Sequence, residues 1–91
     1  MKAVKIKMKP YSYKSDDLLE IDEIYITGCD NPGFFKKEVL HDFLKDNPGA
    51  IQVDIYPYPN LIPEVSVHHE KYVRSAPDWT TRDNLLSLPR V

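Results

Sequence analysis

The chain offers few side chains that could act as a catalytic nucleophile. Its single cysteine, Cys29, is followed by the acidic Asp30 rather than by a base or a cation that would activate a thiol. Covalent catalysis requires a nucleophile held beside a general base, and the sequence suggests no such arrangement. We therefore expect Cys29 to be a small residue of the core and the chain not to be an enzyme.

The densest group of metal-binding residue types is the run His68-His69-Glu70. Neighbouring side chains on a strand point to opposite faces, so both histidines would hold one ion only if a turn rotated them. The spacings typical of zinc sites, such as His-x-x-x-His or Cys-x-x-Cys, do not occur. We predict a solvated hairpin tip here and expect no cofactor, with metal binding left as the alternative.

The N-terminal residues are basic and the residues that follow are acidic. Residues 1–14 carry five lysines and no acid, whereas residues 15–30 carry six acids and no base. Lysines beside tyrosines are typical of surfaces that bind single-stranded nucleic acid. The alternative is an edge strand that its lysines protect from pairing with another chain. The candidate nucleic-acid residues are Lys5, Lys7, Lys9 and Tyr11.

Two tyrosines, each followed by a proline, form a second candidate contact surface. The segment Tyr56-Pro57-Tyr58-Pro59 is predicted to be rigid, extended and unpaired. Tyrosines give a large contact area at a small entropic cost, which suits protein binding, although the same rings could cover the open face of a sheet. The candidate protein contacts are Trp79, Tyr56, Tyr58 and Arg82.

Polar residues near the C-terminus are candidates for a structural clamp. Arg74 lies in the last predicted strand and Asp83 precedes the apolar pair Leu85-Leu86, so a bidentate Arg74–Asp83 pair would hold the tail against the sheet. Asp83 could also cap a short terminal turn. The functional alternative is a small site for an anion or a carboxylate. The clamp candidates are Arg74, Asp78, Asp83 and Asn84.

The elements that position these side chains follow from apolar periodicity. A helix over residues 35–46 places a stripe of apolar residues on one face and its lysines on the other. That stripe is Phe35, Val39, Leu40, Phe43 and Leu44. Alternating residues predict strands at 3–8, 23–28, 50–56, 64–68 and 71–75, with a loop over 11–23. The first strand, with Val4 directed inward, is expected at an edge.

The order β-β-α-β-β-β predicts an α+β fold, in which one amphipathic helix packs on one face of a small, mostly antiparallel twisted sheet. The 91 residues are enough for one domain, residues 1–91, with one modest core. With 12 basic and 14 acidic residues, the net charge of −2 gives the whole chain no attraction to nucleic acid or to an anionic membrane. A single cysteine suits the cytoplasm, and we expect a monomer or a weak homodimer.

The C-terminal segment carries a resemblance to a known family. The sequence KYVRSAPDWTTRDNLLSLP, residues 71–89, combines a strand containing an arginine, a Pro-Asp turn and a short apolar segment. It resembles the C-terminal signature of a bacterial family, domain-of-unknown-function family 3892. The likeness extends more loosely back to Ile24 and leaves residues 1–23 outside it. The resemblance implies a fold unit and a bacterial source, but no activity.

We therefore expect an uncharacterised bacterial domain that acts as a non-catalytic protein-interaction module with an unidentified protein partner. The alternative is a weak single-stranded nucleic-acid binder that uses the N-terminal lysine strand. A steep loss of binding with added salt would favour the nucleic-acid hypothesis, because phosphates that are bound by lysines release their counterions.

Overall fold

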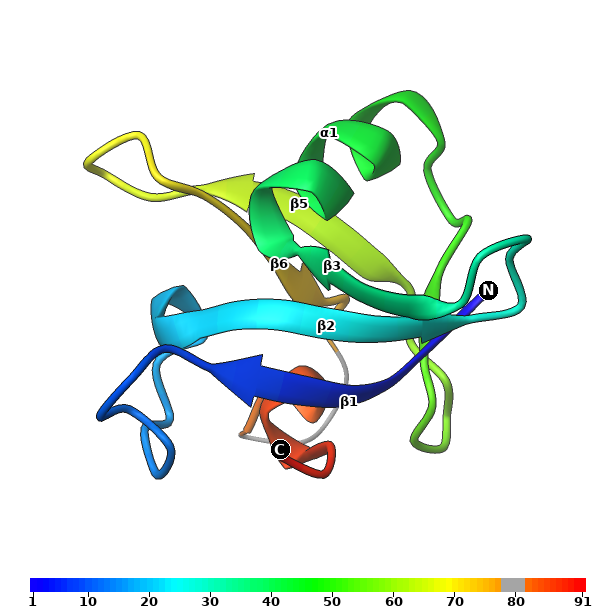
Figure 1. Ribbon diagram of the computed structural model, residues 1–91. Helices are drawn as coiled ribbons and strands as arrows, with labels where there is room; N and C mark the ends of the chain where they lie inside the picture. The colour runs from blue at the N-terminus through cyan, green and yellow to red at the C-terminus, as the bar shows by residue number, and fades with distance from the viewer. Residues whose placement is uncertain (78–81) are drawn as a thin grey trace.

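The computed structural model describes residues 1–77 and 82–91 and confirms the α+β fold (Figure 1). The strands are β1 (Lys2–Met8), β2 (Ile21–Thr27), β3 (Gly33–Lys36), β4 (Gln52–Val53), β5 (Leu61–Val65) and β6 (Lys71–Ser75). The helices are α1 (Lys37–Asp46) and two short 3₁₀ helices, η1 (Leu18–Glu20) and η2 (Asn84–Ser87). Asp78 and Trp79, two of the predicted site residues, lie outside the described residues.

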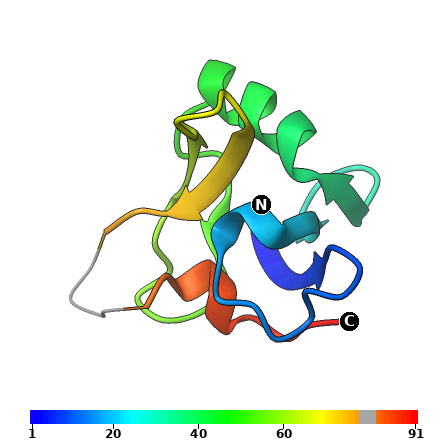
Figure 2. The same cartoon turned by 90° about the vertical axis from the view of Figure 1, so that its left-hand side faces the viewer.

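The described strands form two sheets rather than the single sheet that the sequence predicted. Four strands pair in the order β3-β2-β1-β4, and β5 and β6 form a separate antiparallel hairpin. Figure 2 shows β1 on the right and this hairpin to its left, so the core lies between the two sheets. The predicted strand over 50–56 shortens to two residues because the chain turns at Asp54. The next strand begins at Leu61, three residues before the predicted start at Glu64.

Strand β1 is central, which corrects the predicted edge position. It pairs antiparallel with β2 along one side and parallel with β4 through Lys2 and Ala3 on the other. Further along that second side, the Ile6 N–H donates to the Pro89 carbonyl at 2.9 Å, and the Val91 N–H donates to the Ile6 carbonyl at 3.1 Å. The C-terminal tail therefore continues the sheet where β4 ends. Since both sides of β1 are paired, its lysines do not protect a free edge.

The sequence prediction missed β3 because Phe35 was assigned to the helix. Phe34 pairs with Tyr25, and Phe35 pairs with Ile24, both across an antiparallel ladder with β2. Helix α1 therefore begins at Lys37, two residues later than predicted. In the strand order of this sheet, β3 is at one end and β4 is at the other.

A β-bulge in β1 corrects which residues face the core. Ala3 lies opposite Ile26 and Lys5 lies opposite Tyr25, so Val4 is an extra residue between two consecutive pairs. Ala3 and Ile6 are consequently both buried, whereas Val4, which strict alternation placed inside, is partly exposed. Residues beyond the bulge keep the predicted alternation.

The buried face of α1 is rotated relative to the predicted stripe. Leu40 and Leu44 are buried as expected, but Val39 is 56% exposed and Phe43 is 37% exposed. Lys37 and His41 are buried in their place. Residues 37, 40, 41 and 44 form one helical face, and this face packs chiefly against β5 and β6. The hairpin, rather than the four-stranded sheet, decides which side of the helix is covered.

The tyrosine-proline segment forms a tight turn instead of the predicted extended segment. The Tyr58 N–H donates to the Ile55 carbonyl at 2.7 Å, and Tyr58 has a φ of 60°. The Tyr56–Pro57 peptide bond is cis. In the described part of the chain, no helix has the length and hydropathy needed to cross a membrane.

The rotation of α1 gives a stability prediction for two apolar residues of the same helix. Leu44→Ala should lower the free energy of unfolding by about 2–5 kcal/mol, because it leaves a cavity in the core. Val39→Ala should change it by less than about 0.5 kcal/mol, because that side chain is largely in solvent. Urea denaturation measures both. Equal losses of unfolding free energy in the two variants would support the predicted stripe, in which both residues face the core.

Candidate functional site

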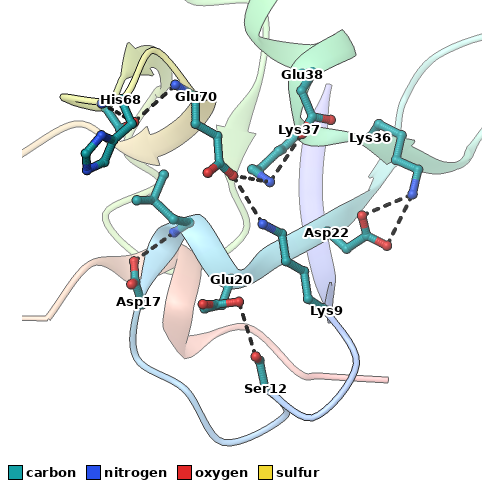
Figure 3. A network of polar contacts seen from close by, with 12 residues as sticks. Lys9, Ser12, Asp17, Glu20, Asp22, Lys36, Lys37, Glu38, His68 and Glu70 are labelled. Atoms are coloured by element: carbon teal, nitrogen blue, oxygen red, sulfur yellow. Dashed lines mark hydrogen bonds and ion pairs between the residues drawn. The ribbon is translucent and has the colours of Figure 1, made fainter.

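A charge network joins the end of β1, the start of α1 and the tip of the β5–β6 hairpin (Figure 3). Glu70 Oε2 lies 3.0 Å from Lys37 Nζ and accepts a hydrogen bond from Lys9 Nζ at 3.2 Å. Lys37 Nζ also lies 3.2 Å from Glu38 Oε1, and the Lys37 side chain is only 2% exposed. One carboxylate oxygen thus bridges two lysines from different elements.

The network shifts the pKa values of Glu70 and Lys9. Hydrogen bonds from Lys37 and then from Lys9 hold the pKa of Glu70 below its usual value, because they stabilise the carboxylate. Burial acts to lower the pKa of Lys9, but its hydrogen bond to Glu70 and the charges of Glu70 and Glu20 raise it overall. Ser12 Oγ donates to Glu20 at 3.2 Å and extends the network into the loop after β1. Lys9 is therefore engaged within the fold, which the sequence did not indicate.

The C-terminal clamp exists, but it is built on Ser75 rather than on a bidentate arginine. Asp83 accepts hydrogen bonds from the Ser75 N–H at 3.2 Å and the Ser75 hydroxyl at 2.9 Å. It also caps η2 by accepting from the Leu85 N–H at 2.9 Å. The Ser75 hydroxyl in turn accepts from the Asn84 N–H at 3.1 Å. The signal in the sequence was the serine next to Arg74.

The contacts of Arg74 with acids among residues 1–77 and 82–91 are long. Its Nε lies 4.0 Å from Asp83 Oδ2, and its Nη1 lies 3.6 Å from Glu64 Oε2. These distances exceed those of a bidentate Arg–carboxylate pair. Within the described residues, the buried Nε has no hydrogen-bond partner. The predicted bidentate pair is therefore wrong, although the two residues do lie close together.

Two further arginines hold the loop between β1 and β2. Arg90, which the sequence analysis missed, donates to the carbonyls of Tyr13 and Ser15, both at 2.7 Å. Arg82, a predicted protein contact, donates to Asp16 Oδ1 at 2.9 Å and to the Leu86 carbonyl at 3.0 Å. The signal for these contacts was the acidic stretch, which needed basic partners from elsewhere in the chain.

The hairpin tip carries His68 and His69, both exposed as predicted. Its turn spans more than two residues, with the Ser66 hydroxyl accepting from the N–H groups of His68 and Glu70. No cluster of three histidine, cysteine or acidic side chains suited to a metal ion occurs among residues 1–77 and 82–91. Cys29 is a free thiol that packs against the core.

The outer face of the four-stranded sheet gathers lysines and aromatic rings. Lys5 Nζ lies 4.7 Å from the centre of the Tyr25 ring and 5.8 Å from that of Phe34. The two rings meet edge to face with centres 5.1 Å apart. At the other end of β1, Lys2 Nζ lies 4.6 Å from the centre of the Tyr58 ring. Lys7, by contrast, lies 3.7 Å from Glu23 on the neighbouring strand.

An apolar groove opens between α1 and the inner side of β2 and β3. It has a volume of about 280 Å³. The residues that line it include Ile26, Cys29, Phe35, Val39, Leu40 and Phe43. Val39 and Phe43 occupy the edge of α1 that the hairpin leaves uncovered, so large apolar side chains remain in contact with solvent.

The structure distributes the predicted candidates over several places. Lys5 lies among the rings of the outer face, Lys7 and Lys9 lie in ion pairs, and Tyr11 is fully exposed in the turn after β1. Tyr56 and Tyr58 are exposed neighbours with ring centres 6.1 Å apart. The sequence analysis did not indicate the groove, because it assigned Val39 and Phe43 to the core.

Comparison with protein families gives one match. A family model described as protein of unknown function (DUF3892) matches residues 3–89. The predicted resemblance is confirmed, and it reaches further than expected, since it includes most of residues 1–23. Comparisons with curated proteins and with solved structures give no match for the chain.

The charge network predicts a specific loss of stability in acid. A carboxylate whose pKa is lowered by folding stabilises the protein above its unfolded pKa, near 4.5, and this contribution disappears as the pH falls through the lower folded pKa. Glu70→Gln should therefore cost about 1–3 kcal/mol at pH 7 and progressively less below about pH 4.5. Denaturation curves at several pH values measure the difference.

The matched control is Glu64→Gln, which removes the same charge from the same hairpin without touching Lys37. Its stability should follow that of the parent protein at every pH within about 0.5 kcal/mol. If Glu70→Gln behaves like this control, the bridged lysines contribute nothing to stability.

The clamp predicts an order of effects in the C-terminal segment. Asp83→Ala removes three hydrogen bonds to Ser75 and Leu85, and it should cost about 1–3 kcal/mol. Arg74→Ala should cost less, about 1 kcal/mol or below, because its ion pairs are long and partly exposed. Thermal melting of both variants gives the order, and a larger loss for Arg74→Ala would reinstate the predicted arginine clamp.

Proposed function

The chain belongs to this family of proteins of unknown function, and we propose that it is a non-catalytic module that binds another protein in the groove beside α1. The observation that carries the proposal is the exposure of Val39 and Phe43 at the rim of an apolar groove. Residues four apart lie on one side of a helix, one turn apart. Such a pair suits apolar side chains presented by a helical segment of the partner.

The size of the groove supports a segment rather than a whole protein surface as the occupant. A volume of about 280 Å³ is at the lower limit of pockets that hold small ligands. It accommodates a few apolar side chains. Their burial would contribute about 1.5–3 kcal/mol for each large side chain.

The charges around the groove favour a basic partner. Asp42 and Asp46 each follow a groove residue by three positions, which places them about 60° further round the helix on its solvent side. Asp30 directly follows Cys29 at the other end of the groove and is exposed. Asp42 is partly neutralised by Lys71 at 2.8 Å, so Asp30 and Asp46 supply most of the free negative charge. The proposed partner is an amphipathic segment with apolar anchors flanked by lysine or arginine.

The polar clusters support a non-catalytic role, because they join separate elements of the fold. Glu70 bridges two lysines, and Asp83 holds Ser75 and caps η2. Each of these clusters joins separate elements, so each has a structural task. The free thiol suits a reducing compartment, and we place the module in the bacterial cytoplasm on that ground.

The test uses a synthetic helical peptide with leucines at positions i, i+3, i+4 and i+7 and lysines elsewhere. In an amide-resolved NMR titration, this peptide should shift the signals of Ile26, Val39 and Phe43. Phe43→Ser should weaken binding by about tenfold, which corresponds to about 1.4 kcal/mol. The variant should fold, because Phe43 is already more than a third exposed.

Two controls decide the outcome. Val67→Ser removes an equally apolar side chain, 90% exposed, from the hairpin tip and should leave the affinity unchanged. A scrambled peptide of the same composition has no apolar face and should not bind. Equal binding of the two peptides would refute the groove as the contact site.

A further inference from the structure

The bulge at Val4 has a second consequence on the solvent side of the sheet. Because Val4 is the extra residue, Lys2 and Lys5 project from the same face of β1, although they are three positions apart. The register then places Lys5, Tyr25 and Phe34 in one row across β1, β2 and β3. Lys2 lies opposite Thr27 in the next row. We call this surface the outer face.

The outer face has no strand or helix of the described residues stacked on it in Figures 1 and 2. In Figure 1, β6 passes behind β2 and η2 lies behind the lower edge of β1, and in Figure 2 the hairpin and η2 both lie to the left of β1. Residues that point the other way, such as Ile6, Ile24 and Ile26, are the ones buried in the core. Tyr25 and Phe34 are partly exposed, although apolar rings of this size gain from being covered.

The ring systems continue around the corner of the sheet. Tyr58 lies under Lys2 at 4.6 Å, and Tyr56 packs against Tyr58 with an angle of 83° between the rings. Tyr56 is 82% exposed and Tyr58 is 48% exposed. One aromatic pair, Tyr25 and Phe34, therefore lies beside Lys5. A second pair, Tyr56 and Tyr58, lies beside Lys2.

The charge of the outer face is opposite to that of the whole chain. Among the described residues, this face carries four lysines and two acids, an excess of two positive charges: Lys2, Lys5, Lys7, Lys36, Glu23 and Asp22. The acids pair with Lys7, at 3.7 Å, and with Lys36, at 3.0 Å. Lys2 and Lys5 instead contact ring faces, where the attraction at an exposed site is weak. These two ammonium groups can therefore turn to an anion.

We propose that the outer face binds single-stranded nucleic acid, with bases stacking on Tyr25, Phe34 and Tyr58 and phosphates held by Lys2 and Lys5. Exposed aromatic rings on a sheet, flanked by positive charges, provide the two interactions that unpaired strands need. A duplex buries the faces of its bases in the stack, so it offers no base for the rings to stack on. This site shares no residue with the groove beside α1, so it stands or falls independently of the protein-binding role.

The proposal differs from the sequence-based one in the residues that it requires. The sequence placed the platform on Lys5, Lys7, Lys9 and Tyr11. Lys9 is held by Glu70 in the charge network, and Lys7 is paired with Glu23. Only Lys5 is common to both sets, because the other required side chains are Lys2 at the start of β1 and rings from β2, β3 and the turn at Tyr58.

The experiment is a fluorescence-anisotropy titration of a labelled ten-nucleotide oligothymidine with the full chain at low salt. We expect saturable binding whose affinity falls as salt rises. The slope of log affinity against log salt should be about −1.4 for two phosphates and at most about −2.8 for four. Phe34→Leu keeps an apolar residue in β3 but removes the stacking surface, and it should weaken binding by about fivefold or more.

Matched controls separate the outer face from general charge attraction. Lys5→Gln should lower the salt slope, whereas Lys45→Gln, the same change on α1, should leave binding unchanged. Tyr11→Asn, which suits the φ of 66° at that position, should also have no effect. The proposal is overturned if the oligonucleotide does not bind, if a duplex or polyglutamate of equal charge binds as well, or if Lys45→Gln weakens binding as much as Lys5→Gln.

Discussion

Strand β1 is hydrogen-bonded along both of its sides, and the rest of the fold is arranged by this double pairing. One side pairs with β2, which pairs in turn with β3, and α1 begins directly after β3. The other side is shared between β4, at Lys2 and Ala3, and the C-terminal tail, at Ile6. Three segments that are far apart in the sequence therefore meet at one strand. A backbone group left unpaired there would be buried without a partner, and this cost fixes the position of each segment.

The second constraint is the burial of a lysine under a glutamate. Lys37 is removed from water at the start of α1, and removing a lone charge from water is costly unless an opposite charge accompanies it. Glu70 supplies that charge from the hairpin tip and also holds Lys9 from the end of β1. This bridge sets the side of α1 that faces the hairpin. It thereby leaves Val39 and Phe43 at the rim of the groove.

The two proposed binding surfaces follow from the charge bridge and from the bulge in β1. The groove exists because the charge bridge turns α1 toward the hairpin, so that one apolar edge of the helix stays open. The outer face exists because a single bulge aligns Lys2 with Lys5 beside the rings of β2 and β3. The groove is apolar with acids nearby, and the outer face is aromatic and basic. They therefore suit partners of different chemistry and can be tested separately.

The sequence alone determined the local features of this protein. Period-two alternation located β2 and β6, a helical stripe with its Asn-Pro-Gly stop located α1, and the C-terminal signature identified the family. These signals are local, because each depends on the spacing of neighbours along the chain. The α+β class also follows from the order of the predicted elements, since one helix among several strands leaves few other arrangements.

Only the tertiary structure decided which partner each element meets. Phe35 fits the first position of a helical stripe as well as a strand, and the ladder with β2 selects the strand. Whether Lys37 or Val39 faces inward depends on Glu70, which lies more than thirty residues away along the chain. Asp83 accepts hydrogen bonds from Ser75 and lies 4.0 Å from Arg74, and the sequence does not indicate which of these two adjacent residues it would bind. Pairing between distant residues leaves no periodic pattern in a sequence, so these choices appear only when the chain is folded.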